Sequence, residues 1–94
     1  MEITKCLTIS TAHITAGTNE KLSNHEEFND VWLPVYDKAE YGYWICIEDV
    51  CYEDFEDIPD DLADCIKLAK RYHCEWLCLD CDGEIVTELQ QYNW

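Results

Sequence analysis

The seventeen residues from Glu48 to Asp64 carry nine carboxylates and no lysine or arginine, and they run directly into the clearest helical pattern of the chain. Apolar and aromatic residues interrupt the acids at regular intervals: Val50, Tyr52, Phe55 and Ile58. Because such side chains gain free energy by leaving water, we expect this acidic run to fold against the body of the protein. A charge run held in this way is a rigid surface and not a solvated tail.

The residues that follow predict an amphipathic helix from Pro59 to about Tyr72. Proline suits the first helical turn, and Asp60 and Asp61 suit the positive end of the helix dipole. Apolar residues recur at the spacing i, i+3, i+4 and i+7 that places them on one face of a helix: Leu62, Cys65, Ile66 and Ala69. Three cations complement the other end of the dipole: Lys67, Lys70 and Arg71. These cations have a structural explanation and require no ligand.

Length and composition favour one globular domain over residues 1–94, with room for a single modest core. Hydrophobic residues make up 48% of the chain, which is enough to fold despite a formal net charge of −15. Such a charge works against direct binding to nucleic acid or anionic lipid, and it favours encounter with a basic protein surface or a cation. The alternative is that the charge only keeps a small protein in solution.

Cysteine usage and the N-terminal residues favour a cytoplasmic protein with free thiols. The cysteines are odd in number: Cys6, Cys46, Cys51, Cys65, Cys74, Cys78 and Cys81. The chain starts without the basic and apolar regions of a secretion signal, and reduced thiols are typical of the cytosol. The longest apolar run, Val31 to Tyr36, has six residues, whereas a membrane span needs about 18 or more. We therefore expect no contact with a membrane.

Alternation of apolar residues and turn signals predict the remaining elements. We expect a first, central strand over Ile3–Ile9, a helix over about Ala16–Leu22 that one of the preceding hydroxyl residues caps, and a second helical start at Asn24 with Glu27. We expect strands over Trp32–Tyr36, Tyr43–Glu48, Glu75–Cys81 and Glu84–Leu89, with Pro34 restricting its strand to an edge or a start and Asp82-Gly83 forming a hairpin turn. The order β-α-β-β-α-β-β predicts an α+β, ferredoxin-like fold: a single layer of mostly antiparallel sheet with two helices on one face.

Two groups of residues resemble metal ligands. The first is the soft set that zinc prefers: His73, Cys74, Cys78 and Cys81. A strand would place Cys78 and Cys81 on opposite faces, which favours buried structural thiols instead. The second group surrounds Gly83 as in part of a calcium loop: Asp80, Asp82 and Glu84. The full spacing of such a loop is absent, and a hairpin explains the same residues. We predict no cofactor.

The sequence contains no arrangement that is typical of an enzyme. His13 lies near Ser10, Thr11 and Thr15 and has the chemistry of a general base beside a hydroxyl nucleophile. No acidic residue that would orient His13 can be identified, and helix capping explains the hydroxyl residues equally well. None of the cysteines has the neighbours that activate a thiol. We therefore predict a protein that is not an enzyme.

Aromatic residues are more abundant than so small a core can hide. Four tryptophans and six tyrosines occur in 94 residues, so we expect some of these rings to remain exposed. Exposed aromatic side chains beside carboxylates are a composition that protein interfaces favour, because tyrosine and tryptophan anchor a partner while charges steer it.

Four short segments resemble a family of short, acidic, uncharacterised bacterial and phage domains. They are Ile9–Thr15 (ISTAHIT), Leu33–Tyr36 (LPVY), Ile58–Leu62 (IPDDL) and Cys74–Gly83 (CEWLCLDCDG). This chain has His73 where the family has a small turn residue. Members of the family occur in mobile elements alongside genes of the antirestriction type, and the family has no catalytic residues to carry over. The resemblance implies a phage, plasmid or integrated element as context, and with it an inhibitor of a host nucleoprotein.

We interpret the chain as an acidic interaction protein that imitates the charge of a nucleic acid and blocks a basic surface, as an anti-CRISPR or antirestriction protein does. The expected partner is a basic host protein or nucleoprotein complex, with no direct binding to nucleic acid. The expected contact residues are Glu48, Asp49, Glu53, Asp54, Glu56, Asp57, Asp60, Asp61 and Asp64. The alternatives are a small domain that binds zinc through cysteine and histidine or has hydrolytic activity, and an orphan domain whose target is recognised by shape and aromatic side chains.

Overall fold

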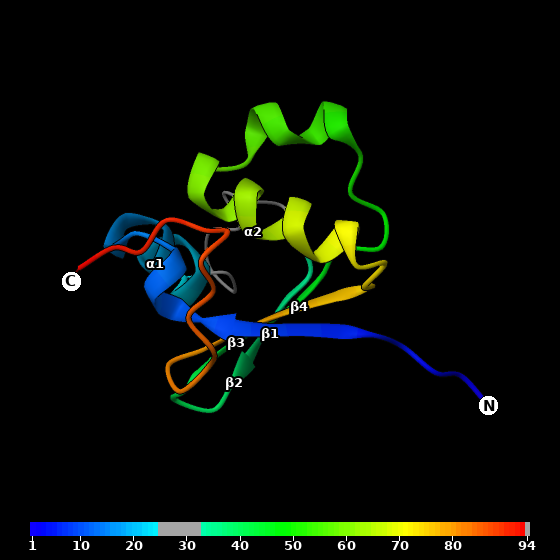
Figure 1. Cartoon of the computed structure of the whole chain (residues 1–94), viewed down its shortest axis with the longest axis horizontal. Coiled ribbons are helices and arrows are strands. Elements are labelled where there is room, and N and C mark those ends of the chain that lie inside the picture. Colours follow the sequence, from blue (N-terminus) through cyan, green and yellow to red (C-terminus); the bar gives the residue numbers. More distant parts are fainter. Residues whose placement is uncertain (25–32, 94) are drawn as a thin grey trace.

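A computed structural model describes residues 1–24 and 33–93 and shows an α+β fold built on one sheet (Figure 1). Its elements in chain order are strand β1 (Cys6–Ser10), the 3-10 helix η1 (Thr11–His13), helix α1 (Ala16–Ser23), strands β2 (Val35–Lys38) and β3 (Gly42–Cys46), the 3-10 helix η2 (Tyr52–Asp57), helix α2 (Asp60–Arg71) and strand β4 (Trp76–Asp80). The predicted α+β class and the combination of two α-helices with a single sheet are confirmed for the described residues.

The four strands lie in the order β1-β4-β3-β2. Strand β1 is parallel to β4, whereas β3 is antiparallel to both β4 and β2. The sheet is therefore mixed, and the predicted ferredoxin-like order is not confirmed. The strand that we expected at the centre, Ile3–Ile9, begins only at Cys6 and lies at one edge. The two central strands are β3 and β4, and each of them pairs with another strand along both of its edges.

The predicted fifth strand, Glu84–Leu89, is wrong. Both edges of β4 already pair with another strand, so the segment after β4 has no free edge of that strand to fold back on. The chain instead turns, with the Gly83 amide donating to the Asp80 carbonyl at 2.9 Å, and crosses to the outer edge of β1. There the Ser10 amide donates to the Glu84 carbonyl at 2.9 Å. A single bridge between Ile9 and Glu84 replaces the predicted hairpin.

Helix α2 covers one face of the sheet, and η2 lies on the side of α2 that faces away from the sheet (Figure 1). The apolar stripe predicted for α2 is buried as a whole: Leu62, Cys65, Ile66 and Ala69. It packs into one core with side chains from β3 and β4, among them Ile45, Leu77 and Leu79. Because this stripe follows the helical period of 3.6 residues, all of it packs on the sheet, and this packing holds the acidic run over the sheet.

Helix α1 follows its prediction closely. The side chain of Thr15 caps it by accepting a hydrogen bond from the Thr18 amide at 3.2 Å. Asn24 ends this helix, and the rest of the predicted second helical start, from residue 25 through Glu27, lies outside the described residues, as do Val31 and Trp32. The predicted strand over Trp32–Tyr36 corresponds to β2, which begins immediately after Pro34 and lies at an edge, as proline requires.

The C-terminal end of α2 closes with a Schellman motif. The His73 amide donates to the Lys70 carbonyl and the Cys74 amide to the Ala69 carbonyl, both at 3.0 Å. His73 itself has a φ of 61°, the left-handed conformation that glycine adopts most readily. This geometry explains why a small turn residue suits this position. No helix in the described part of the chain is long and apolar enough to cross a membrane.

Candidate interaction surface

The acidic run folds onto the body of the protein, as its sequence predicts. Val50 and Ile58, on either side of η2, are both less than 5% exposed. Phe55, within η2, is half-buried against the core, and the Lys67 ammonium of α2 lies 5.0 Å from the centre of its ring. These contacts hold η2 against α2, so the carboxylates between them have fixed positions.

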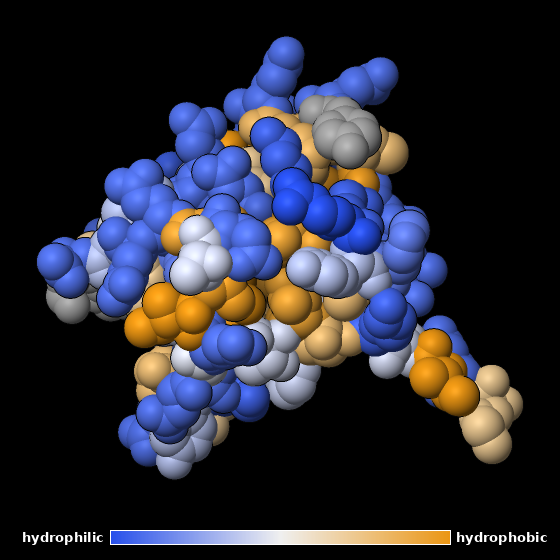
Figure 2. All heavy atoms as spheres, viewed as in Figure 1, coloured by the Kyte–Doolittle hydropathy of each residue, from blue (hydrophilic) through white to orange (hydrophobic). Residues whose placement is uncertain are grey.

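Seven of the nine predicted contact residues are exposed: Glu48, Asp49, Glu53, Glu56, Asp57, Asp60 and Asp64. Figure 2 shows mostly hydrophilic side chains over the part of the molecule that η2 and α2 occupy. Asp54 is half-buried, and its carboxylate accepts a hydrogen bond from the Cys51 amide at 2.8 Å, which caps η2. Its position in the run therefore has a structural cause as well.

Asp61 is not part of the surface. It is only 8% exposed, and its carboxylate accepts hydrogen bonds from the Thr15 amide at 2.7 Å and the Thr18 hydroxyl at 2.9 Å. These bonds join the first turn of α2 to the first turn of α1. Asp61 therefore serves the fold, and we remove it from the predicted contact surface. Its neighbour Asp60 points to solvent because successive helical residues lie about 100° apart.

The exposed carboxylates of η2 and α2 form two short columns. Glu53 and Glu56 are three residues apart in a 3-10 helix, so they lie on one side of it and are separated by about 6 Å along its axis. Asp60 and Asp64 are four residues apart on α2, again about 6 Å along the axis. We call these four residues together with Asp57 the acidic surface. Its geometry suits contact with several cationic side chains at once.

His13 holds the C-terminal segment in place. It is 1% exposed. The Val86 amide donates to its Nε2 atom at 3.0 Å, which leaves Nδ1 to carry the proton and to donate to the Gln90 carbonyl at 2.9 Å. Both ring nitrogens are therefore bonded to backbone groups, and the ring contacts no hydroxyl through them. The neighbouring Ser10 and Thr15 hydroxyls accept from backbone amides of η1 and α1, as helix capping predicts.

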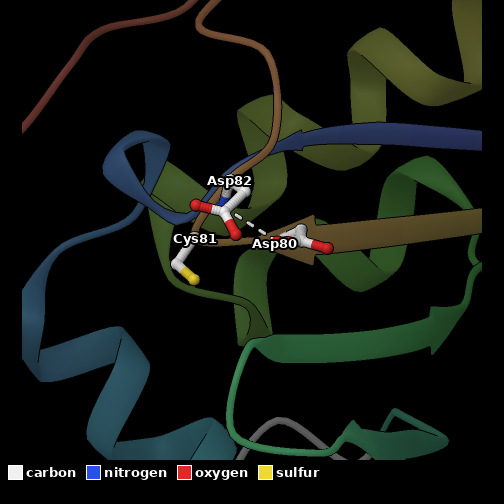
Figure 3. A group of neighbouring side chains, drawn as sticks. All are labelled: Asp80, Cys81 and Asp82. Atoms are coloured by element: carbon white, nitrogen blue, oxygen red, sulfur yellow. Dashed lines mark hydrogen bonds between the residues drawn. The ribbon is translucent and has the colours of Figure 1, made fainter.

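The residues of the zinc hypothesis do not come together. His73 and Cys81 are exposed, Cys74 is half-buried, and Cys78 is fully buried. In the described residues, a group of three potential metal ligands within 4.8 Å occurs once, at the consecutive Asp80, Cys81 and Asp82 (Figure 3).

Hydrogen bonds within the turn and from strand β2 account for the group in Figure 3. The Asp80 carboxylate accepts from the Lys38 ammonium at 2.6 Å and from the Asp82 amide at 2.8 Å. The bond from Lys38 holds the pKa of the Asp80 carboxyl below its usual value. This carboxylate stabilises the turn after β4 and neutralises a cation of β2. We therefore assign no metal ion to this group.

The cysteines are free thiols. Burial raises the pKa of the Cys65 thiol to about 12, with smaller contributions from the Asp61 and Asp64 carboxylates. Burial likewise raises the pKa of the Cys6 thiol. A nucleophilic thiol requires the opposite shift, because the thiolate is the reactive form. These two cysteines are structural or surface residues.

Sequence reasoning missed a second feature, on the sheet face opposite α2. Each of three strands contributes one aromatic residue, and these surround a hollow of about 440 Å³ together with Cys6 of β1 and Thr4 before it: Tyr36 of β2, Trp44 of β3 and Trp76 of β4. The rings of Tyr36 and Trp76 lie 6.0 Å apart between centroids. The excess of aromatic residues is the signal that indicates such a feature, but the strand order is needed to place these three together. We call it the aromatic hollow.

Comparison with known proteins identifies one family. Residues 6–94 match the family described as a family of unknown function (DUF5983), C-terminal domain. No curated protein and no solved structure matches the chain. The match covers both the acidic surface and the aromatic hollow, apart from Thr4.

Proposed function

Because the chain belongs to this family of unknown function, we propose its function from its own surface: a non-enzymatic protein that binds a basic surface of another protein through the acidic surface. The observation that carries this proposal is the group of exposed carboxylates on η2 and α2, held in fixed positions by Val50, Phe55 and Ile58. A rigid surface of one charge sign attracts the opposite charge over distances up to about the Debye length, which is about 8 Å at physiological ionic strength.

The net charge of −15 supports the same proposal. It accelerates encounter with a positive surface and opposes encounter with phosphate groups. The hydrogen bonds of His13 and the ion pair of Asp80 favour a binding protein over an enzyme, because both side chains stabilise the fold through these contacts. The proposal therefore needs no chemical step.

The finer proposal concerns the class of partner. We propose that the basic surface is the nucleic-acid site of a host nucleoprotein, so that the protein acts as an inhibitor of the anti-CRISPR or antirestriction type from a phage or mobile element. Two considerations support it: nucleic-acid sites are the most strongly basic protein surfaces, and the resemblance described above implies a mobile-element context. The spacing of about 6 Å in each column gives repeated negative charge along a rigid element.

The experiment compares two variants of equal net charge. The first removes charge from the acidic surface by Glu53→Gln, Glu56→Gln, Asp57→Asn and Asp64→Asn. The second removes the same charge elsewhere by Glu2→Gln, Glu20→Gln, Glu40→Gln and Glu84→Gln, all exposed residues outside the acidic run. Asp60 is kept in both because it also complements the dipole of α2.

Each variant is tested for inhibition of nucleic-acid binding by a purified nucleoprotein nuclease of a restriction or CRISPR system, at several salt concentrations. We expect the first variant to lose inhibition by more than tenfold and the second by less than threefold, since bulk charge is matched and only its place differs. Equal loss in both variants contradicts a defined acidic surface. Inhibition by the unmodified protein that does not weaken with salt contradicts the electrostatic basis altogether.

A further inference from the structure

The aromatic hollow lies on the sheet face that no helix of residues 1–24 and 33–93 covers. Side chains alternate between the two faces of a strand, and the register aligns Tyr36 with Trp44, and Cys46 with Trp76. Trp44 and Trp76 are half-buried, and Tyr36 is 56% exposed. Leu77, Leu79 and Ile45 alternate with these residues and point to the core instead. The three aromatic residues of the hollow therefore belong to the sheet, and Thr4 of the segment before β1 completes the lining together with Cys6.

One end of this face already holds a cation. The Lys38 ammonium lies 4.9 Å from the centre of the Trp44 ring, 3.6 Å from the Cys78 sulfur and 2.6 Å from the Asp80 carboxylate. The Asp80 hydrogen bond raises the pKa of Lys38, so the group over the ring carries a full positive charge at neutral pH. This arrangement shows that the face accepts a cation against its aromatic rings. The rings of Trp76 and Tyr36 have no such cation among the contacts of the described residues.

Acidic residues adjoin the end of the sheet where Trp76 lies, opposite the end that holds Lys38. The turn after β3 contains the exposed Glu48 and Asp49 and closes with the Val50 amide donating to the Ile47 carbonyl at 3.1 Å. Glu75 directly precedes Trp76, and its carboxylate accepts from the Lys5 amide at 2.7 Å. The Lys5 ammonium at this end is bonded to the Tyr72 carbonyl at 2.6 Å, and the described residues that line the hollow carry no charge of their own. The aromatic lining and the net charge of −15 therefore favour a positively charged occupant with an apolar stem.

Two other occupants fit the observations poorly. A second copy of the chain would bring another net charge of −15 to the same face. Four strands of about five residues also offer a projected area of only roughly 300 Å², whereas a stable interface buries about 800 Å² on each partner. Single-stranded nucleic acid stacks on aromatic sheet faces, but it does so beside basic residues that neutralise its phosphates. Lys38 is already paired with Asp80.

We propose that the aromatic hollow receives an arginine or lysine side chain from the basic partner protein, with the cation over Trp76 and Tyr36. This inference rests on the proposed function and extends it, because it adds an anchor on the open sheet face to the acidic surface on the other side of the molecule. Cation–π contacts with tryptophan contribute free energies that correspond to about 2- to 30-fold in affinity. The contact gives specificity that carboxylates alone do not provide.

The probe is an acetylated hexa-arginine peptide, with a hexa-citrulline peptide of equal length as its neutral control. Binding is followed by nuclear magnetic resonance at 0.15 M salt through the indole N–H signals of Trp44 and Trp76, and affinity is measured by calorimetry. We expect hexa-arginine, and not hexa-citrulline, to shift the Trp76 signal. We expect Trp76→Leu to weaken binding by 2- to 30-fold, and Trp76→Phe to weaken it less.

Tyr36→Leu is a second test that does not depend on the folding of the Trp76 variants, since Tyr36 is exposed on an edge strand. Unchanged indole signals, or unchanged affinity in both Tyr36→Leu and Trp76→Leu, overturns the inference. So does tighter binding of a single-stranded oligonucleotide than of hexa-arginine, or a dimer that Trp76→Leu abolishes.

The four-residue variant of the acidic surface separates the two proposals. If that variant loses inhibition while the Trp76 and Tyr36 variants keep full affinity for the peptide, the hollow is overturned and the acidic surface stands. If the Trp76 and Tyr36 variants lose affinity and the acidic-surface variant inhibits as well as the matched control, the proposed function fails and the hollow is a cation site of its own.

Discussion

Replacing Asp61 by asparagine tests whether one carboxylate of the acidic run belongs to the core. The carboxylate accepts two hydrogen bonds, from the Thr15 amide at 2.7 Å and the Thr18 hydroxyl at 2.9 Å. Asparagine has nearly the same shape but only one oxygen, so its NH₂ group must face one of these two donors. The NH₂ group then faces either the Thr15 N–H or the Thr18 hydroxyl, which has to give up the bond it donates in order to accept, in a site that is 8% exposed.

The expected loss of stability follows from these two bonds. A hydrogen bond to a charged group contributes roughly 1.5 to 3 kcal/mol, and the variant loses at least one such bond and weakens the other. We therefore expect Asp61→Asn to lower the free energy of unfolding by about 2 to 4 kcal/mol. The matched control is Asp60→Asn, which changes the same charge in the same helical turn. That residue is exposed, and the helix dipole limits its effect to about 0.3 to 1 kcal/mol.

Urea denaturation followed by tryptophan fluorescence measures both values, with the slope of the transition checked for constancy. A double-mutant cycle with Thr18→Val isolates the bond to the hydroxyl, and we expect a coupling free energy of at least about 1 kcal/mol. If Asp61→Asn and Asp60→Asn differ by less than about 0.5 kcal/mol, the assignment of Asp61 to the fold is refuted. Asp61 would then return to the predicted contact surface.

Three further outcomes are expected. His13→Ala removes the acceptor of the Val86 amide and the donor to Gln90, so hydrogen exchange at the Val86 amide should accelerate by more than tenfold while exchange in the centre of the sheet changes far less. His73→Gly should raise the free energy of unfolding by about 0.5 to 1 kcal/mol in chemical denaturation, because φ is 61° at this position. Iodoacetamide at pH 8 should label the exposed Cys51 at least tenfold faster than Cys65, whose pKa of about 12 keeps it protonated; comparable rates by mass spectrometry would contradict the burial.

Helix α2 illustrates what the sequence predicts well. The spacing of Leu62, Cys65, Ile66 and Ala69 is a local property, and a helix that follows this spacing buries all four side chains wherever the sheet lies. The predicted N-terminal proline and the predicted end near Tyr72 agree with the observed helix to within a residue. The same reasoning placed the acidic run against the body of the protein, since Val50 and Ile58 could not remain in water without a cost.

The strand order was not predictable in this way, because pairing joins residues that are distant in sequence. The first strand carries few charges, which indicated a central position, yet β1 lies at an edge. Its outer side is closed in part by Glu84 and its neighbours. Asp82-Gly83 is a strong local signal for a hairpin, but the occupied edges of β4 override it. A turn does form there, and only its continuation as a strand fails.

In the candidate site, too, local features were predictable and tertiary features were not. Asp60 and Asp61 are equivalent as acids at a helix N-terminus, and only the position of α1, with Thr15 and Thr18, separates a surface residue from a buried one. Likewise, alternation predicts which face of its own strand Trp44 or Trp76 occupies, but it does not predict that the two strands are neighbours. Exposure and proximity are tertiary properties that the residue types alone do not determine.

The position of β4 also has a consequence for the folding of the chain. This strand is formed by the last of the sheet residues, yet it joins β1 to the β2–β3 pair, and its pairing with β1 joins residues 70 positions apart. During synthesis, β1 and the β2–β3 pair must therefore wait for residues 76–80 before a continuous sheet exists. Closing so long a loop costs entropy before it is rewarded by contacts, so we expect a high contact order and slow folding for a chain of this length. A chain that ends before Trp76 leaves the edges of β1 and β3 unpaired and open to aggregation.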